Sequence, residues 1–173
     1  LEVLAEGTEA PSEPSKPFVF SPRAPSHTTS DTTRRPVVAS AVTQTHAEIQ
    51  ESLYHSLVSA YGEDNVAAEQ PTVTGQRVDL VVQLNGGYAY YEIKPSYSPR
   101  ECIRDAIGQL LEYSSWPGGE QLKELWVVGR GELDEEAEEY LAILEKKFRM
   151  PIGYLRHDPQ PTCVSKQNRN LPS

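Results

Sequence analysis

Three charged residues near the middle of the chain could together do chemistry on a phosphate: Asp79, Glu92 and Lys94. Asp79 and Glu92 offer the hard carboxylate oxygens that Mg²⁺ and Mn²⁺ prefer as ligands. A metal held there can polarise a phosphoryl group and help to make hydroxide from water. Lys94 can orient that water or stabilise the negative charge that develops. The alternative is a solvated salt bridge on an exposed hairpin, which these three residues alone do not exclude.

A β-hairpin over residues 77–94 must position these side chains. Apolar residues alternate with polar ones in its first half, aromatic and β-branched residues fill its second half, and an Asn-Gly-Gly run favours a tight turn between them. Glu92 and Lys94 are two residues apart and share one face of their strand. Asp79 joins them only if it pairs with Glu92, through a four-residue loop at 84–87 or one bulge; a plain three-residue loop puts it on the opposite face. We predict the pairing with Glu92.

The rest of the chain predicts an α/β fold in which a mixed central β-sheet is flanked by helices. The expected helices cover 45–61, 98–114 and 134–148, and the further expected strands cover 66–74, 122–128 and 151–155. Arg100 and Arg104 are one turn apart on the second helix, where they could hold phosphates or pair with neighbouring acids.

Composition divides the chain into three parts. Residues 1–44 are rich in Pro, Ser and Thr and poor in large apolar residues, which is typical of an extended or disordered linker. Residues 45–156 form the expected domain, and 157–173 form a polar, flexible tail. A linker in the first position implies another domain upstream, so we expect this chain to be the effector part of a larger protein.

The formal net charge of −9 counts against nucleic-acid binding, which usually needs a basic face. This objection is partial, because residues 132–139 alone hold six of the carboxylates. A local basic edge that includes Arg77, Arg100 and Arg104 could survive beside them.

Cysteine content and hydropathy indicate a cytoplasmic protein. Cys102 and Cys163 form neither a disulfide framework nor a zinc-site spacing, which suits a reducing compartment. The chain has no run of 18 apolar residues and no signal peptide, so we expect no membrane partner. The sequence leaves open whether the chain forms a homo-oligomer.

Gln109 and Tyr113 complete a pattern that resembles a known family. They are one helical turn apart and point the same way from the helix that follows the hairpin. Asp79, then Glu92-Ile93-Lys94, then this helix resembles the PD-(D/E)xK nuclease superfamily, and the Gln-x-x-x-Tyr element is similar to its RecB and Cas4-like branch. The expected element order also matches, over about residues 45–155.

The resemblance implies a restriction-endonuclease-like core that hydrolyses phosphodiester bonds of nucleic acid, DNA being expected more than RNA, and by analogy a role in defence. It implies that Asp79 and Glu92 bind Mg²⁺ or Mn²⁺ and that Lys94 is the catalytic lysine. It further implies that Gln109 and Tyr113 orient the site or touch the substrate backbone.

The first helix of the superfamily often supplies a further catalytic group, a Glu or, in the RecB-like branch, a His. Glu48 is the candidate for the first, as a metal ligand, and His46 for the second. The chain departs from the family pattern at Val78, where Pro often precedes the Asp. It also lacks cysteines with iron–sulfur cluster spacing, so the cluster of some Cas4-like members should be absent.

Two other interpretations compete with a nuclease. The chain could be a catalytically silent module of the same fold that binds nucleic acid or a protein partner, which the acidic balance favours. It could also be a structural α/β domain whose hairpin charges form a surface ion pair. Metal binding that depends on Asp79 distinguishes the nuclease from this last interpretation.

Overall fold

The computed structural model describes residues 17–26 and 37–159, and it contains the mixed β-sheet that the sequence predicts. The strands lie side by side in chain order; the β1–β2 and β2–β3 pairs are antiparallel, whereas the β3–β4 and β4–β5 pairs are parallel. The strands are β1 (Val66–Pro71), β2 (Arg77–Leu84), β3 (Gly87–Ile93), β4 (Leu122–Gly129) and β5 (Ile152–Arg156). The helices are α1 (Val37–Tyr61), the short 3-10 helix η1 (Glu63–Asn65), α2 (Pro99–Ser115) and α3 (Glu135–Phe148).

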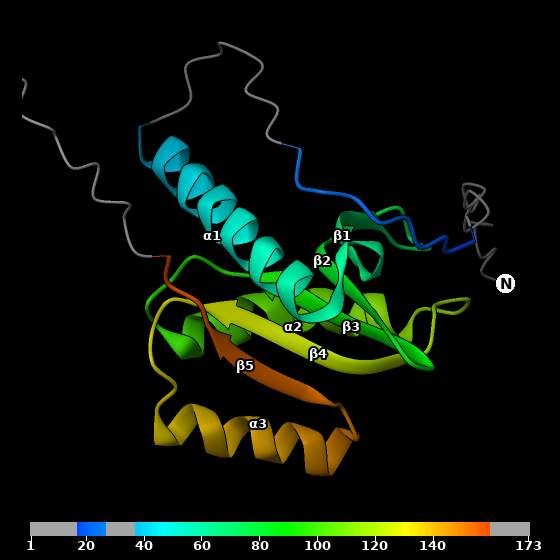
Figure 1. Ribbon diagram of the computed structural model, residues 1–173. Helices are drawn as coiled ribbons and strands as arrows, with labels where there is room; N and C mark the ends of the chain where they lie inside the picture. The colour runs from blue at the N-terminus through cyan, green and yellow to red at the C-terminus, as the bar shows by residue number, and fades with distance from the viewer. Residues whose placement is uncertain (1–16, 27–36, 160–173) are drawn as a thin grey trace, which may run out of the picture.

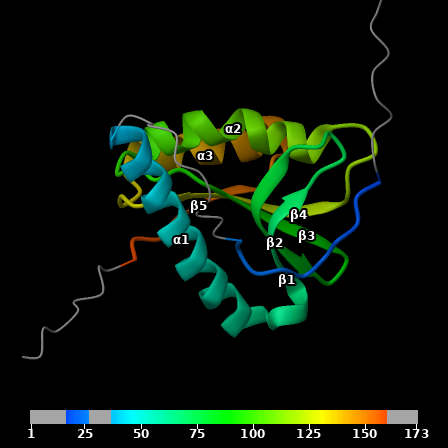
Figure 2. The ribbon, with the colours of Figure 1, turned by 90° about the horizontal axis from the view of Figure 1, so that it is seen from above.

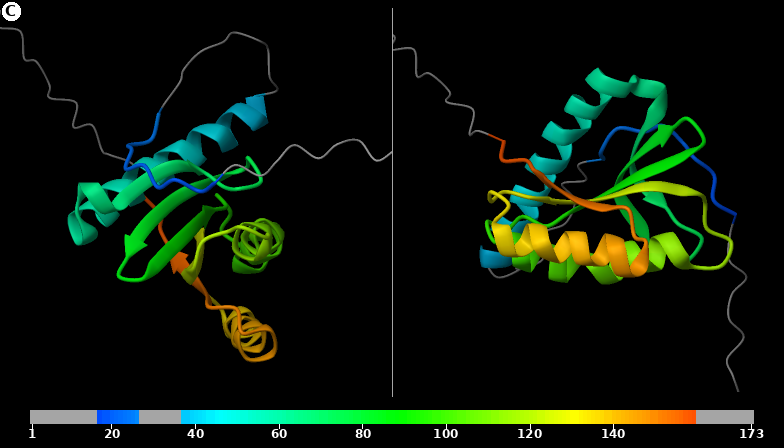
Figure 3. Two further views of the ribbon diagram at one scale, coloured as in Figure 1. Left: turned by 90° about the vertical axis from the view of Figure 1, so that its right-hand side faces the viewer. Right: turned by 90° about the horizontal axis from the view of Figure 1, so that it is seen from below.

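Helices cover both faces of the sheet, as Figures 1 and 3 show: α1 lies on one side, and α2 and α3 lie together on the other. On the α1 side, Ile49 and Leu53 pack against Leu80 of the sheet. On the other side, Ile103 and Leu110 of α2 belong to the second core cluster. Because both faces are covered, the central strands are largely apolar on both sides.

Polar side chains cap the N-termini of α2 and α3. The Ser98 hydroxyl accepts a hydrogen bond from the Glu101 N–H, and the Asp134 carboxylate accepts one from the Ala137 N–H. The α1 start is not where the cap pattern predicts it: the helix begins eight residues earlier, and Thr45 donates its hydroxyl to the carbonyl of Ala41 inside the helix. No helix in the described part of the chain is long and apolar enough to cross a membrane.

The β2–β3 hairpin has the predicted register with a shorter turn. Leu84 pairs with Gly87, which leaves Asn85 and Gly86 as the two turn residues, and Gly86 takes the positive φ of 78° that a tight turn needs. The pairing continues to Leu80 opposite Tyr91. One more step along both strands places Asp79 opposite Glu92, as we predict from the sequence.

Residues 17–26, within the stretch whose composition predicts a linker, form a strap along the outer edge of β1 (Figure 2). Its Arg23 makes a parallel bridge with Ala67. The buried Gln70 side chain accepts a hydrogen bond from the Ser21 N–H at 3.2 Å and donates one to the Val19 carbonyl at 2.8 Å. The strap is therefore held by its backbone, in an extended conformation.

Aromatic side chains anchor the strap to the hairpin. The Phe18 and Tyr88 rings meet edge to face with centroids 5.1 Å apart, and the Phe20 and Tyr88 centroids are 5.7 Å apart. Val19, between the two Phe residues, is 69% exposed. This alternation is what an extended segment lying on an apolar surface produces.

Candidate active site

Asp79 on β2, Glu92 on β3 and Lys94 just after β3 lie together at one end of the hairpin. The Lys94 ammonium is 3.0 Å from Glu92 Oε1. Asp79 Oδ2 accepts a hydrogen bond of 2.7 Å from the Ile93 N–H, so the backbone of the neighbouring strand orients this carboxylate. The three residues of the sequence motif thus form one cluster.

Glu92 is the unusual member of the cluster, because its side chain is only 3% exposed. Its Oε1 pairs with Lys94, whereas its Oε2 is buried and has no hydrogen-bond partner among the described residues. Burial, reinforced by the negative charge of Asp79, raises the pKa of Glu92 from 4.5 to about 7, although Lys94 and His46 oppose the rise. A buried oxygen without a partner is costly, so this atom suits a ligand that the protein does not itself supply.

A chain of hydrogen bonds joins Lys94 to α2. The Lys94 ammonium donates to Gln109 Oε1, and Gln109 Nε2 donates to the Tyr113 hydroxyl at 3.3 Å. That hydroxyl in turn donates to the Arg77 carbonyl at 3.3 Å. Burial raises the pKa of Tyr113 to about 12, so the hydroxyl keeps its proton and can donate. The structure therefore brings the Gln-x-x-x-Tyr element to the lysine.

Of the two candidates on α1, the structure brings His46 to the cluster. His46 Nε2 lies 3.2 Å from Asp79 Oδ2. Burial lowers the pKa of His46, but the hydrogen bond and the charge of Asp79 outweigh it, so the net shift is upward. Glu48 is exposed and accepts a hydrogen bond from Gln44 instead, because two residues along a helix point to different sides.

Gln50 is a contributor that the sequence analysis does not identify. Its side-chain amide is buried and donates a hydrogen bond of 3.0 Å to the backbone carbonyl of Asp79. It follows His46 by one helical turn, so both residues lie on the face of α1 that meets β2. That spacing is the signal that could have found it.

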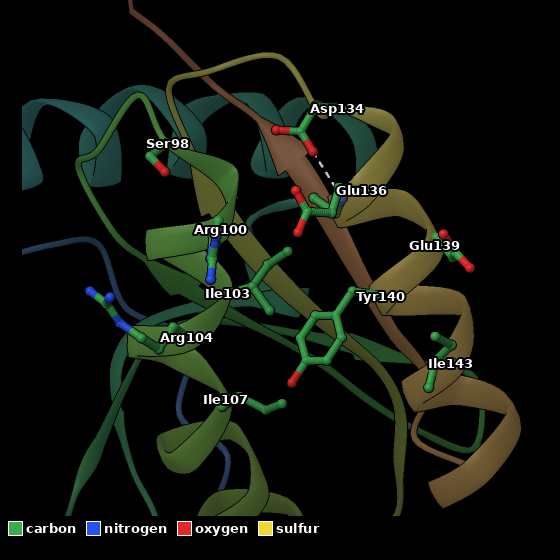
Figure 4. Close-up of a pocket in the computed structure, with 11 residues that line it drawn as sticks. Ser98, Arg100, Ile103, Arg104, Ile107, Asp134, Glu136, Glu139, Tyr140 and Ile143 are labelled. Carbon is green, nitrogen blue, oxygen red and sulfur yellow. Dashed lines mark hydrogen bonds between the residues drawn. The ribbon is translucent and has the colours of Figure 1, made fainter.

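The arginines expected to bind substrate are not gathered at the cluster. The exposed guanidinium of Arg77 lies 3.6 Å from the Glu69 carboxylate. Only the backbone carbonyl of Arg77 belongs to the site, where it accepts a hydrogen bond from the Tyr113 hydroxyl. Figure 4 shows Arg100 and Arg104 on α2, beside a groove of about 710 Å³ between α2 and α3 that shares no lining residue with the cluster. The predicted basic edge is therefore divided between two surfaces.

The donor set fits a divalent cation held by two carboxylates. Within residues 17–26 and 37–159, no group of three or more His, Cys, Asp or Glu side chains is arranged to hold a metal ion. Mg²⁺ is commonly bound through one or two carboxylates, with waters and substrate phosphates completing its shell. Asp79 and Glu92 provide such a pair, and the unpartnered oxygen of Glu92 is the atom that such an ion would satisfy.

No family model matches the sequence, and no match was found among curated proteins or solved structures.

Proposed function

We propose that this chain is a metal-dependent nuclease domain of the PD-(D/E)xK type, close to the RecB and Cas4-like branch, which hydrolyses the phosphodiester bonds of a nucleic acid, with DNA expected more than RNA. The observation that carries the proposal is the buried carboxylate of Glu92, which has one oxygen on Lys94 and the other without a partner. A structural ion pair would not need a buried and unsatisfied oxygen. A metal ligand does.

The arrangement around Glu92 also agrees with this function. Asp79 is opposite Glu92 on the neighbouring strand, and Lys94 is on the same face two residues on. Gln109 reaches the lysine from the following helix and is itself bonded to Tyr113. A solvent-exposed hairpin salt bridge, the competing interpretation, would have none of these second contacts.

Each residue has a role in the proposed reaction. Asp79 and Glu92 would hold Mg²⁺ or Mn²⁺, which when bound supplies a Lewis acid that polarises the phosphoryl group and lowers the pKa of water. His46 orients the Asp79 carboxylate through its hydrogen bond. The Lys94 ammonium, positioned by Gln109, stabilises the negative charge that develops on the phosphoryl oxygens.

A cleavage assay on the full chain tests the proposal. Single- and double-stranded DNA and RNA would each be incubated with Mg²⁺, Mn²⁺ or EDTA, and wild type would be compared with Lys94→Ala and with Lys146→Ala, a surface lysine on α3. We expect cleavage that needs metal, is lost in Lys94→Ala and is retained in Lys146→Ala. Equal cleavage by Lys94→Ala would contradict the proposal, and binding without cleavage would favour the silent module.

A further inference from the structure

Tyr97 is an exposed aromatic residue close to the candidate active site. It follows Lys94 by three residues in the loop between β3 and α2, so the two Cα atoms are at most about 11 Å apart. That distance corresponds to only a few stacked nucleotides at about 3.4 Å each. The loop also lies at the carboxyl ends of the parallel strands, on the left in Figure 1. Ligands of α/β sheets usually bind at this end of the strands.

The Tyr97 ring is held against Arg130, which follows β4. The guanidinium carbon of Arg130 lies 4.2 Å from the ring centroid, yet Tyr97 remains 60% exposed. Arg130 covers one face of the ring, and an exposure this high leaves the other face open to solvent. A cation behind an aromatic ring also fixes its orientation.

Arg130 is itself immobilised. The Arg130 side chain is 25% exposed and its Nε pairs with Asp158 at 2.8 Å, and the backbone N–H of Arg130 donates to the Ser96 carbonyl at 2.9 Å. The charge of Arg130 is therefore matched within the protein, which makes it a support for the ring and not a free phosphate ligand.

The loop between β3 and α2, which carries Tyr97, packs closely against the loop that follows β4. A Cβ atom placed on Gly131 would lie 1.9 Å from the carbonyl oxygen of Tyr97, so only glycine permits this approach. The Lys94 N–H donates to the Val128 carbonyl at 2.8 Å, which ties the same loop to the end of β4. The aromatic ring is thus presented on a rigid base.

From these contacts we propose that Tyr97, supported by Arg130, is a stacking platform for an unpaired base of the substrate, so that the enzyme acts on strands with unpaired bases beside the cleaved bond. This inference rests on the proposed nuclease function and specifies its substrate class. Stacking requires a free π-face on a fixed ring, which Tyr97 has. A base inside a duplex has both of its faces covered by neighbours and cannot use the platform.

The test uses the full chain carrying Lys94→Ala, which we expect to bind without cutting, together with Mg²⁺ and oligonucleotides that contain 2-aminopurine, whose fluorescence is quenched by stacking. Adding Tyr97→Ala should weaken single-strand binding about 5- to 100-fold and relieve the quenching, whereas duplex affinity stays the same. Tyr97→Phe should retain both signals. Tyr140→Ala, which removes a similarly exposed tyrosine from α3, should change neither.

Two results would overturn the platform: single-strand affinity unchanged in Tyr97→Ala, or single-strand and duplex affinity lowered equally. Failure of the nuclease proposal gives a different pattern. In that case neither wild type nor Tyr97→Ala cleaves any substrate in the presence of any metal. A further outcome is that wild-type cleavage requires both metal and Lys94 while Tyr97→Ala keeps the same preference for single strands. In that outcome the stacking platform is wrong and the nuclease proposal stands.

Discussion

At the scale of single residues, Glu92 combines two properties that conflict unless a ligand is present. It is buried almost completely, and its carboxyl is surrounded by Asp79 on one side and Lys94 on the other. The motif alone predicts the position of Glu92, but it could not predict the unpartnered oxygen, because burial depends on how α2 packs over the sheet. The choice between His46 and Glu48 has the same origin, since only the packing angle of α1 decides which of the two faces β2.

Glu92 should destabilise the metal-free protein at alkaline pH. The fold raises its pKa from 4.5 to about 7, so the stabilising contribution of Glu92 is largest below pH 4.5 and is lost as the pH rises through 7. Glu92→Gln removes the buried charge. We expect the free energy of unfolding of this variant, relative to wild type, to rise by about 2 kcal/mol between pH 5 and pH 8.

Urea unfolding at the two pH values, in EDTA, measures this difference. Glu48→Gln is the matched control, because it removes an exposed carboxylate from α1. A Glu92→Gln difference that does not depend on pH would show that the carboxyl is not strained in the fold.

Gln109 should act on the reaction through Lys94. Gln109→Ala removes the acceptor that holds the Lys94 ammonium on the side of α2. We expect kcat to fall by roughly 10- to 100-fold with little change in KM, since misplacing a catalytic group by about 1 Å costs this much. Leu111→Ala, an exposed change on the same helix, should leave kcat at the wild-type value, and an equal loss there would point to a general disturbance of α2.

At the scale of elements, the sequence predicts most of the fold, and the errors have physical causes. Periodicity and caps find the helices and strands, and the register of the hairpin follows from the need to pair Asp79 with Glu92. Periodicity also predicts that Leu111, Tyr140 and Phe148 face the core, but all three are exposed. The buried residues of the two helices include the predicted Leu110 and Ala137, together with Ala106, and small side chains such as these alanines let the helices approach the sheet closely.

Composition could not predict the strap, because the strap is held to the domain by backbone hydrogen bonds and by only two Phe rings. Phe18→Ala should lower the free energy of unfolding by about 1–2 kcal/mol, since the ring packs against Tyr88 and Tyr90. Val19→Ala should have little effect, because Val19 points to solvent. Chemical denaturation of the two variants compares them directly, and a Phe18→Ala variant as stable as wild type would mean that the Phe18 contact does not contribute to stability.

At the scale of the whole molecule, the question is how a chain of net charge −9 could hold a polyanion. Part of the acid is explained by structure alone: Glu135, Glu136 and Glu138 are in the first turn of α3, where the helix dipole favours them. Among the described residues near the cluster, Arg77 is already paired with Glu69, and Arg100 and Arg104 lie along another groove. In the proposed function the metal would therefore supply much of the attraction.

Nucleic-acid binding by Lys94→Ala should accordingly need a divalent metal and depend only weakly on salt. Fluorescence anisotropy with a labelled single strand should show binding in Mg²⁺ and none in EDTA at physiological salt. With so few free cations, the slope of log affinity against log salt should be about −2 or shallower. A steep slope, or full binding in EDTA, would locate the binding surface away from Asp79 and Glu92.

Calorimetric titration of Mn²⁺ into the full chain at pH 8, where Glu92 is ionised, measures whether Asp79 and Glu92 bind a metal ion. We predict one site in wild type, and loss of that site in both Asp79→Ala and Glu92→Gln, with Glu48→Gln binding as wild type does. Wild-type Mn²⁺ affinity in Glu92→Gln, or no binding by any of the proteins, would contradict the assignment of the buried carboxylate pair as a metal site.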